Sequence, residues 1–167
     1  MFIILPQSGI TNYIQLHCII VILVEIHKSA VVPYSADEMY ALVNDIESYP
    51  VFLPWCSAAE VLNRGLRQLT ASVSLETGKI KLSFTTENIM HPGRSIEMRL
   101  IKGPFRHLTG SWKFGPVNKK SCTVSLDLDF EFKNKLLKLA LGSTFNKIMK
   151  TLVESFTRRA EAIYGRR

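Results

Sequence analysis

The feature that most constrains how this chain folds is its C-terminal run, residues 134–164, which contains no proline and repeats apolar residues at helical spacing. At about 1.5 Å per residue, the run would form a helix of about 45 Å. Steps of three and four residues place its apolar side chains on one stripe. The stripe consists of Leu137, Leu141, Phe145, Ile148, Leu152, Phe156, Ala160 and Ile163. Asn134 suits the N-cap position and Gly165 the C-terminal end. Because such a helix is not stable alone in water, it must pack against a large apolar surface.

The middle of the chain predicts that surface, since short segments of alternating apolar and polar residues follow one another there. The clearest segment is 121–132, in which Leu126 and Leu128 would face one side and Asp127 and Asp129 the other. The predicted strands are 59–63, 69–76, one beginning at Ile80, 95–102, 108–114 and 121–132, with turns at Gly78, 91–93, 103–104 and 115–116. This pattern indicates an antiparallel meander with one solvent face and one face covered by the long helix.

The first part of the predicted domain adds one strand and two short helices. Residues 24–32 alternate in part and end before Pro33, which predicts the first strand. Ser35 and Glu38 form a capping box that opens a helix, and a second helical turn is expected in the proline-containing segment 48–56. The prediction is therefore an α+β fold, in which a curved antiparallel sheet wraps around the long C-terminal helix. A tapering apolar space between sheet and helix is a natural ligand cavity.

Residues 1–23 differ in character from the rest of the chain. They contain no Lys or Arg, so they lack the basic region of a signal peptide. Their apolar run, 18–24, is too short to span a bilayer. We expect residues 1–23 to be a non-core extension and residues 24–165 to form a single domain without a transmembrane segment. Cys18, Cys56 and Cys122 form no CxxC pair, which favours free thiols in a reducing compartment such as the cytoplasm.

The net charge of +7 is concentrated at the C-terminal end. From Lys133 onward the chain has nine Lys or Arg and two Glu, an excess of seven that equals the net charge of the whole chain. This asymmetry favours an anionic partner, either RNA or an acidic membrane surface. The alternative is an ordinary solvated helix face, because Glu154 lies four residues from both Lys150 and Arg158 and can partly neutralise them. The sequence leaves both interpretations open.

Motifs of enzymes and metal sites are absent from the sequence. No GxGxxG, GxxxxGK, GxSxG or HExxH occurs, and the four histidines are scattered. Asp127, Asp129 and Glu131 repeat at strand period, so we interpret them as solvated residues and not as metal ligands. Trp55 and Trp112 could stack on a ring, although core packing is the simpler interpretation. We therefore expect no catalytic residue, no metal and no required cofactor.

Three segments closely resemble the coenzyme Q-binding START-like family, in its branch of bacterial ribosome association toxins. They are PYSADEMYALVNDIESYPVFLPWC at 33–56, GPFRHLTGSWKF at 103–114 and LDFEFKNKLLKLALGSTF at 128–145. The resemblance runs from about residue 24 to residue 164. It implies the helix-grip fold, which agrees with the order of strands and helices predicted above. These motifs are specific to the family, but they are not catalytic.

The resemblance implies two functions. In the bacterial branch, the similar protein is the toxin of a type II toxin–antitoxin system. It binds the large ribosomal subunit, blocks its association with the small subunit and so prevents initiation, and a small antitoxin protein is the expected partner. In the mitochondrial branch, the similar protein is a chaperone that holds ubiquinone in its cavity and supports respiration. This sequence is closer to the bacterial branch. A cyclase-like enzyme is a third and weaker option, because related cavities host such chemistry. Fold does not determine function, however, and the missing acid/base set counts against this option.

Each function has its own candidate residues. For the ribosome, contacts to rRNA phosphates and not to DNA are expected from Lys135, Lys138, Lys147, Lys150, Arg158 and Arg159. For ubiquinone or another apolar ligand, the candidate cavity residues are Tyr49, Phe52, Leu53, Trp55, Phe84, Met98, Trp112, Phe130, Leu137, Leu141 and Phe145. The simpler interpretation of each cavity residue is ordinary core packing. The expected location is the cytoplasm. If the protein carries ubiquinone or another lipid, peripheral contact with the inner membrane is also expected.

Overall fold

The structure is a computed structural model that describes residues 24–78 and 80–167. The expected extension, residues 1–23, and its Cys18 lie outside the described residues, so these expectations stay predictions. Cys56 and Cys122 are buried free thiols, and burial raises the pKa of Cys122 to about 11. Within the described ranges, no helix is long and apolar enough to cross a membrane.

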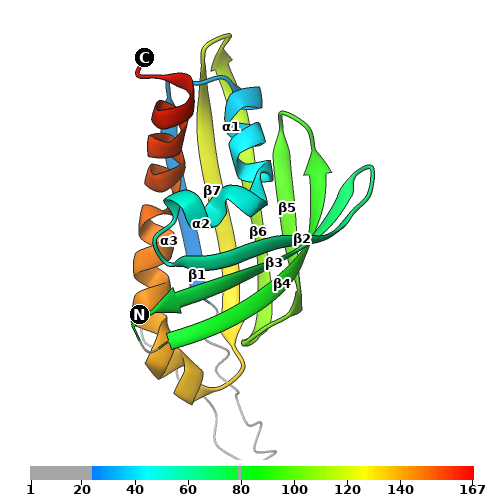
Figure 1. The fold of residues 1–167 in the computed structure, drawn as a ribbon, viewed down its shortest axis with the longest axis vertical. Coiled ribbons are helices and arrows are strands. Elements are labelled where there is room, and N and C mark those ends of the chain that lie inside the picture. Colours follow the sequence, from blue (N-terminus) through cyan, green and yellow to red (C-terminus); the bar gives the residue numbers. More distant parts are fainter. Residues whose placement is uncertain (1–23, 79) are drawn as a thin grey trace, which may run out of the picture.

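The elements follow the predicted order of one strand, short helices, six strands and a long helix (Figure 1). They are β1 (Val24–Val32), α1 (Ala36–Asn44), the short 3₁₀ helix η1 (Ile46–Ser48), α2 (Tyr49–Phe52), β2 (Cys56–Arg64), β3 (Gln68–Thr77), β4 (Ile80–His91), β5 (Ser95–Lys102), β6 (Phe105–Asn118), β7 (Ser121–Phe132) and α3 (Lys135–Tyr164). The predicted strands are present, but several of them extend further than the sequence pattern indicated.

One predicted turn is wrong. Gly115 and Pro116 lie inside β6, and the chain turns only after Asn118. Proline cannot donate a ladder hydrogen bond, but β5 pairs with β6 only up to Lys113, so the Pro116 position has no neighbour on that side. On the other side Pro116 pairs with Cys122, next to a register irregularity. The strand therefore tolerates a proline that would interrupt a central strand.

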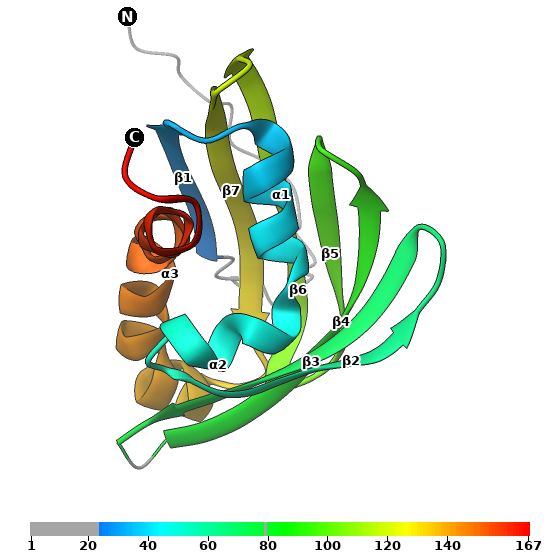
Figure 2. The same ribbon diagram turned by 45° about the horizontal axis from the view of Figure 1, so that its top comes forward.

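The seven strands form one antiparallel sheet in the order β1-β7-β6-β5-β4-β3-β2. The first and last strands are neighbours, and Val24 to Val32 pair without interruption with Phe130 to Cys122. The sheet curves, and α1, α2 and α3 lie on the inner side of the curve (Figures 1 and 2). This arrangement is the helix-grip fold, so the predicted fold class is confirmed.

The apolar stripe of α3 is the face that packs inside the curved sheet. Its buried residues are Leu141, Phe145, Ile148, Met149, Leu152, Val153, Phe156 and Ala160. The prediction is wrong for Ile163, which is 46% exposed. In the last turn Tyr164 takes the inner position, where its ring lies 6.1 Å from the ring of Tyr34 and its hydroxyl donates to Glu38 O. The last turn of the helix thus packs against Tyr34 and the first turn of α1.

The capping box at the start of α1 is confirmed. The Ser35 hydroxyl accepts a hydrogen bond from the backbone of Glu38 at 3.3 Å, and the Glu38 carboxylate accepts one from the backbone of Ser35 at 2.8 Å. The helix that begins there covers the core with Met39 and Leu42, which are 0% and 5% exposed. Loss of the cap should therefore destabilise the whole domain.

We expect Ser35→Ala to lower the free energy of unfolding by about 1 kcal/mol, the usual contribution of such a cap. Urea denaturation followed by circular dichroism measures this change. Ser143→Ala is the control, because Ser143 is exposed on α3 and its substitution should change stability by no more than about 0.5 kcal/mol. Equal stability of the two variants would show that the cap does not support the fold.

Candidate functional site

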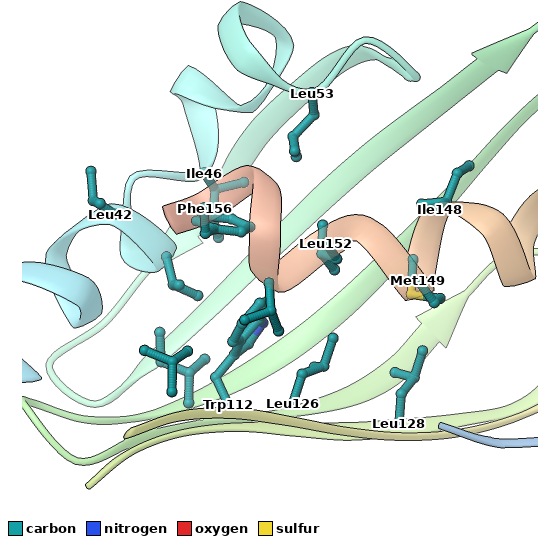
Figure 3. Packing of buried hydrophobic residues seen from close by; sticks show 14 of the residues in the cluster. Leu42, Ile46, Leu53, Trp112, Leu126, Leu128, Ile148, Met149, Leu152 and Phe156 are labelled. Atoms are coloured by element: carbon teal, nitrogen blue, oxygen red, sulfur yellow. The ribbon is translucent and has the colours of Figure 1, made fainter. Parts of the chain in front are cut away.

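An inner cavity of about 90 Å³ lies between the curved sheet, α3 and the segment around α2. Six of its lining residues are labelled in Figure 3, where Met149, Leu152 and Phe156 of α3 face Trp112, Leu126 and Leu128 of the sheet. Of the candidate cavity residues predicted from the sequence, those that line this cavity are Tyr49, Leu53, Trp55, Phe84, Met98, Trp112 and Phe145. Seven of the eleven candidate residues are therefore brought together around one space by the fold.

The other four candidates lie elsewhere. Phe130 is 1% exposed and belongs to a cluster of phenylalanines, with its ring 4.7 Å from that of Phe145. Phe52 packs against Phe156, with the two ring centres 5.1 Å apart. Leu141 lines a small hollow between α3 and the β3–β4 hairpin, and Leu137 is half-buried at the start of α3. The structure gives these four no place in the wall of the cavity.

The cavity is small for a ligand site. Sites for small molecules usually have about 300–1,000 Å³, and one water molecule occupies about 30 Å³ in the liquid. The 90 Å³ present would therefore not enclose a substituted quinone ring unless the wall moved. Met98 and Met149 line the cavity, and methionine side chains adapt to irregular spaces. The wall therefore contains two flexible side chains that could change conformation to make room for a ligand.

Two polar wall residues, Thr86 and Asn88, were missed by the sequence analysis. They are 6% and 4% exposed, and both line the cavity. The sequence did contain a signal for them. If the alternation of Ile80, Leu82 and Phe84 is continued along the strand, Thr86, Asn88 and Met90 fall on the same inner face of β4. Tyr49, which is half-buried, also lines the cavity. Its hydroxyl donates to Val43 O at 2.6 Å, and desolvation of this hydroxyl raises the pKa of Tyr49 far above the ordinary value.

The six candidate ribosome contacts of α3 are not equivalent. Lys135, Lys147 and Lys150 are exposed, and none of them joins an ion pair within the described part of the chain. Lys150 and Lys28 of β1 together line a shallow surface hollow. Lys138 is half-buried. The lysines of α3 thus provide a basic face that is open to an anionic partner.

The two arginines of this set already have partners. Arg158 pairs with Glu154 one turn earlier, which is the partial neutralisation that the spacing allowed. The guanidinium group of Arg159 lies over the ring of Phe52, 5.3 Å from its centroid, and the residue is half-buried. Arg159 therefore packs against α2, and its contribution to the fold would be lost together with its charge.

The C-terminal tail is tied back to α1. Arg167 donates two hydrogen bonds to the Glu38 carboxylate at 2.9 and 3.1 Å, and its guanidinium group lies 5.4 Å from the centre of the Tyr34 ring. The Tyr34 hydroxyl donates to Gly165 O at 2.9 Å. The hydrogen bonds from Arg167 hold the pKa of Glu38 below its ordinary value of 4.5. The pairing therefore stabilises the fold above that pH and is lost as the pH falls.

The outer face of the sheet carries paired charges. Asp127 pairs with His27 and with Lys113, whose Nζ lies 2.9 Å from the carboxylate. The hydrogen bonds from these two residues lower the pKa of Asp127, and the one from His27 has the larger effect. Arg106 lies 3.5 Å from Glu131. A wide hollow of about 820 Å³ on this face is lined by both acidic and basic residues. Among the described residues, no group of three His, Cys, Asp or Glu is placed to hold a metal ion.

Comparison with known sequences and solved structures identifies proteins that are similar to this chain. The family model for polyketide cyclase/dehydrase and lipid transport matches residues 32–157. The ribosome association toxin RatA of Escherichia coli K12 is 43% identical over 147 residues, which cover 88% of this chain and 93% of that protein. The mitochondrial coenzyme Q-binding protein COQ10 homolog B of Xenopus laevis is 28% identical, over 86% of this chain and 60% of that protein. The Zhui aromatase/cyclase of Streptomyces sp. R1128 has the same fold, with a TM-score of 0.75 at 15% identity over 83% of this chain and 94% of its own.

Proposed function

This chain belongs to the polyketide cyclase/dehydrase and lipid transport family, and from this premise we propose that it is a ribosome association toxin that binds the large ribosomal subunit. The observation that carries the proposal is the 43% identity to a protein of that name over 88% of this chain. The bound protein would block joining of the small subunit, so that translation initiation fails. The proposal includes a cytoplasmic location and a small antitoxin protein as the partner that restrains it.

The proposed mechanism is steric and needs no catalytic residue. Lys135, Lys147 and Lys150 would contact rRNA phosphates, because exposed ammonium groups that pair with no described residue can replace the counterions of the phosphates. The outer face of the sheet is a poorer candidate, since its charges of both signs pair with one another. The basic face of α3 is therefore the surface that we assign to the ribosome.

Sucrose-gradient profiles of a cell extract test this function. Added protein should increase the free subunits at the expense of joined ribosomes, and it should sediment with the large subunit. An unchanged profile, with the protein remaining at the top of the gradient, would contradict the proposal. Purified subunits should give the same result, which would show that no other component of the extract is needed.

A second candidate function is the transport of an apolar ligand such as ubiquinone. The inner cavity and the similarity to a coenzyme Q-binding protein support it. The volume of about 90 Å³ counts against enclosure of a whole quinone ring without movement of the wall. A protein that does not sediment with large subunits but extracts quinone from membranes would favour this function over the first.

A further inference from the structure

Asn88 lines the inner cavity, and its side-chain oxygen has no hydrogen-bond partner among the described residues. Asn88 is 4% exposed, and its Oδ1 atom is fully buried and accepts no hydrogen bond from any described residue. A buried acceptor left unpaired is unfavourable, and native structures contain few of them. Within the described part of the chain it is the only such side-chain atom. An apolar residue at this core position would make the fold more stable, unless the Asn88 carboxamide accepts a hydrogen bond from a bound molecule.

The sheet register explains why the protein itself does not satisfy Asn88. Its neighbours across the sheet are Leu69 of β3 and Met98 of β5, and neither side chain donates a hydrogen bond. Thr86 lies two residues earlier on the same face of β4 and also lines the cavity. The two polar side chains therefore make a polar patch in a wall that is otherwise almost entirely apolar.

The remainder of the wall indicates what kind of molecule fits. Tyr49, Trp55, Phe84 and Trp112 all line the same space, so a planar ring could pack against ring faces and edges. Benzene occupies an engineered cavity of about 150 Å³, so the 90 Å³ present needs only moderate widening to hold one ring. Flexible Met98 and Met149 can provide that space.

We propose that the inner cavity binds a hydroxylated aromatic ring, a phenol or hydroquinone, whose hydroxyl group donates a hydrogen bond to Asn88 Oδ1. The inference rests on the second proposed function, ligand binding in the cavity, and it adds the chemistry of the ligand. A quinone has only carbonyl acceptors on its ring and cannot donate to Oδ1. The cavity therefore prefers the reduced, donor-bearing form of such a ring to the oxidised form.

Binding of phenol and toluene to the full-length protein, measured by NMR titration of the amide signals, tests the inference. The two probes have nearly the same size, but only phenol can donate a hydrogen bond. We expect phenol to bind at least as tightly as toluene, although toluene is the more hydrophobic molecule. In Asn88→Leu, the ratio of phenol affinity to toluene affinity should fall by at least about tenfold, because the acceptor is gone. Asn88→Leu should also melt at a higher temperature, since it removes an unpaired buried acceptor.

Asn63→Leu is the matched control, because it makes the same substitution at an exposed position of β2 and should leave the ratio unchanged. If Asn88→Leu does not fold, the ratio of phenol affinity to toluene affinity is measured for Asn88→Ala instead, with the same expected fall. Binding of both probes with a ratio that Asn88→Leu does not alter would overturn the role of Asn88 and leave ligand transport standing. No binding of either probe at millimolar concentration would overturn both, while ribosome binding would be tested separately by the gradients.

Discussion

Phe145→Ala is expected to lower the free energy of unfolding by about 3–5 kcal/mol, the range for deletion of a buried phenylalanine side chain. Phe145 is 3% exposed and lies in the first half of α3. Its ring centre is 4.7 Å from that of Phe130 and 5.3 Å from that of Phe105. It also lines the inner cavity, so its removal would enlarge a space that is already present. Urea denaturation gives the change in free energy.

Leu139→Ala on the same helix is the control for this prediction. Leu139 is 82% exposed, so its truncation should change stability by no more than about 0.5 kcal/mol. A loss below about 1.5 kcal/mol for Phe145→Ala would mean that the ring faces open space and does not act as core. In that case the same variant should weaken binding of a cavity ligand, and unchanged ligand binding would contradict both interpretations.

The second large effect is expected for the double variant Lys147→Gln, Lys150→Gln in ribosome binding. If both lysines contact rRNA phosphates, the slope of log affinity against log salt should decrease by about 1.4–1.8, which is about 0.7–0.9 for each lost contact. The variant should also shift subunits less in gradients. Its fold should be intact, because both side chains are exposed. Binding to purified large subunits at several salt concentrations measures the slope.

Lys119→Gln, Lys120→Gln is the matched control. It removes the same charge from exposed positions in the turn between β6 and β7, so it should leave the slope unchanged. Arg158 and Arg159 are left intact in both variants, since one pairs with Glu154 and the other packs on Phe52. If the double lysine variant inhibits subunit joining at full strength, Lys147 and Lys150 are not part of the contact surface.

The order of elements could be predicted because its signals are local. Alternation in 121–132 predicts a strand, and spacing of three and four residues in 134–164 predicts a helix, whatever the chain does elsewhere. The capping box at Ser35 is also local, since its two partners are three residues apart. The position of the turn after β6 was not predictable in this way, because Pro116 is tolerated only where β5 has already ended.

The candidate site was predicted in part. An apolar inner face indicated a cavity wall, and seven predicted residues line one space. The sequence could not show that the space is only about 90 Å³, because cavity volume depends on how side chains from β3 to α3 meet. Nor could it show that Asn88 faces Leu69 and Met98, which follows from the register of three strands.

The sequence by itself therefore determined the order of the elements, most of their apolar faces and the excess of basic residues after Phe132. The tertiary structure alone decided which of those charges are free. Arg167 pairs with Glu38 across 129 positions of sequence, Arg159 lies over Phe52, and Lys147 and Lys150 remain exposed. The physical reason is range: backbone propensity and periodicity act over a few residues, whereas ion pairs, stacking and cavity shape depend on segments that only the folded chain brings together.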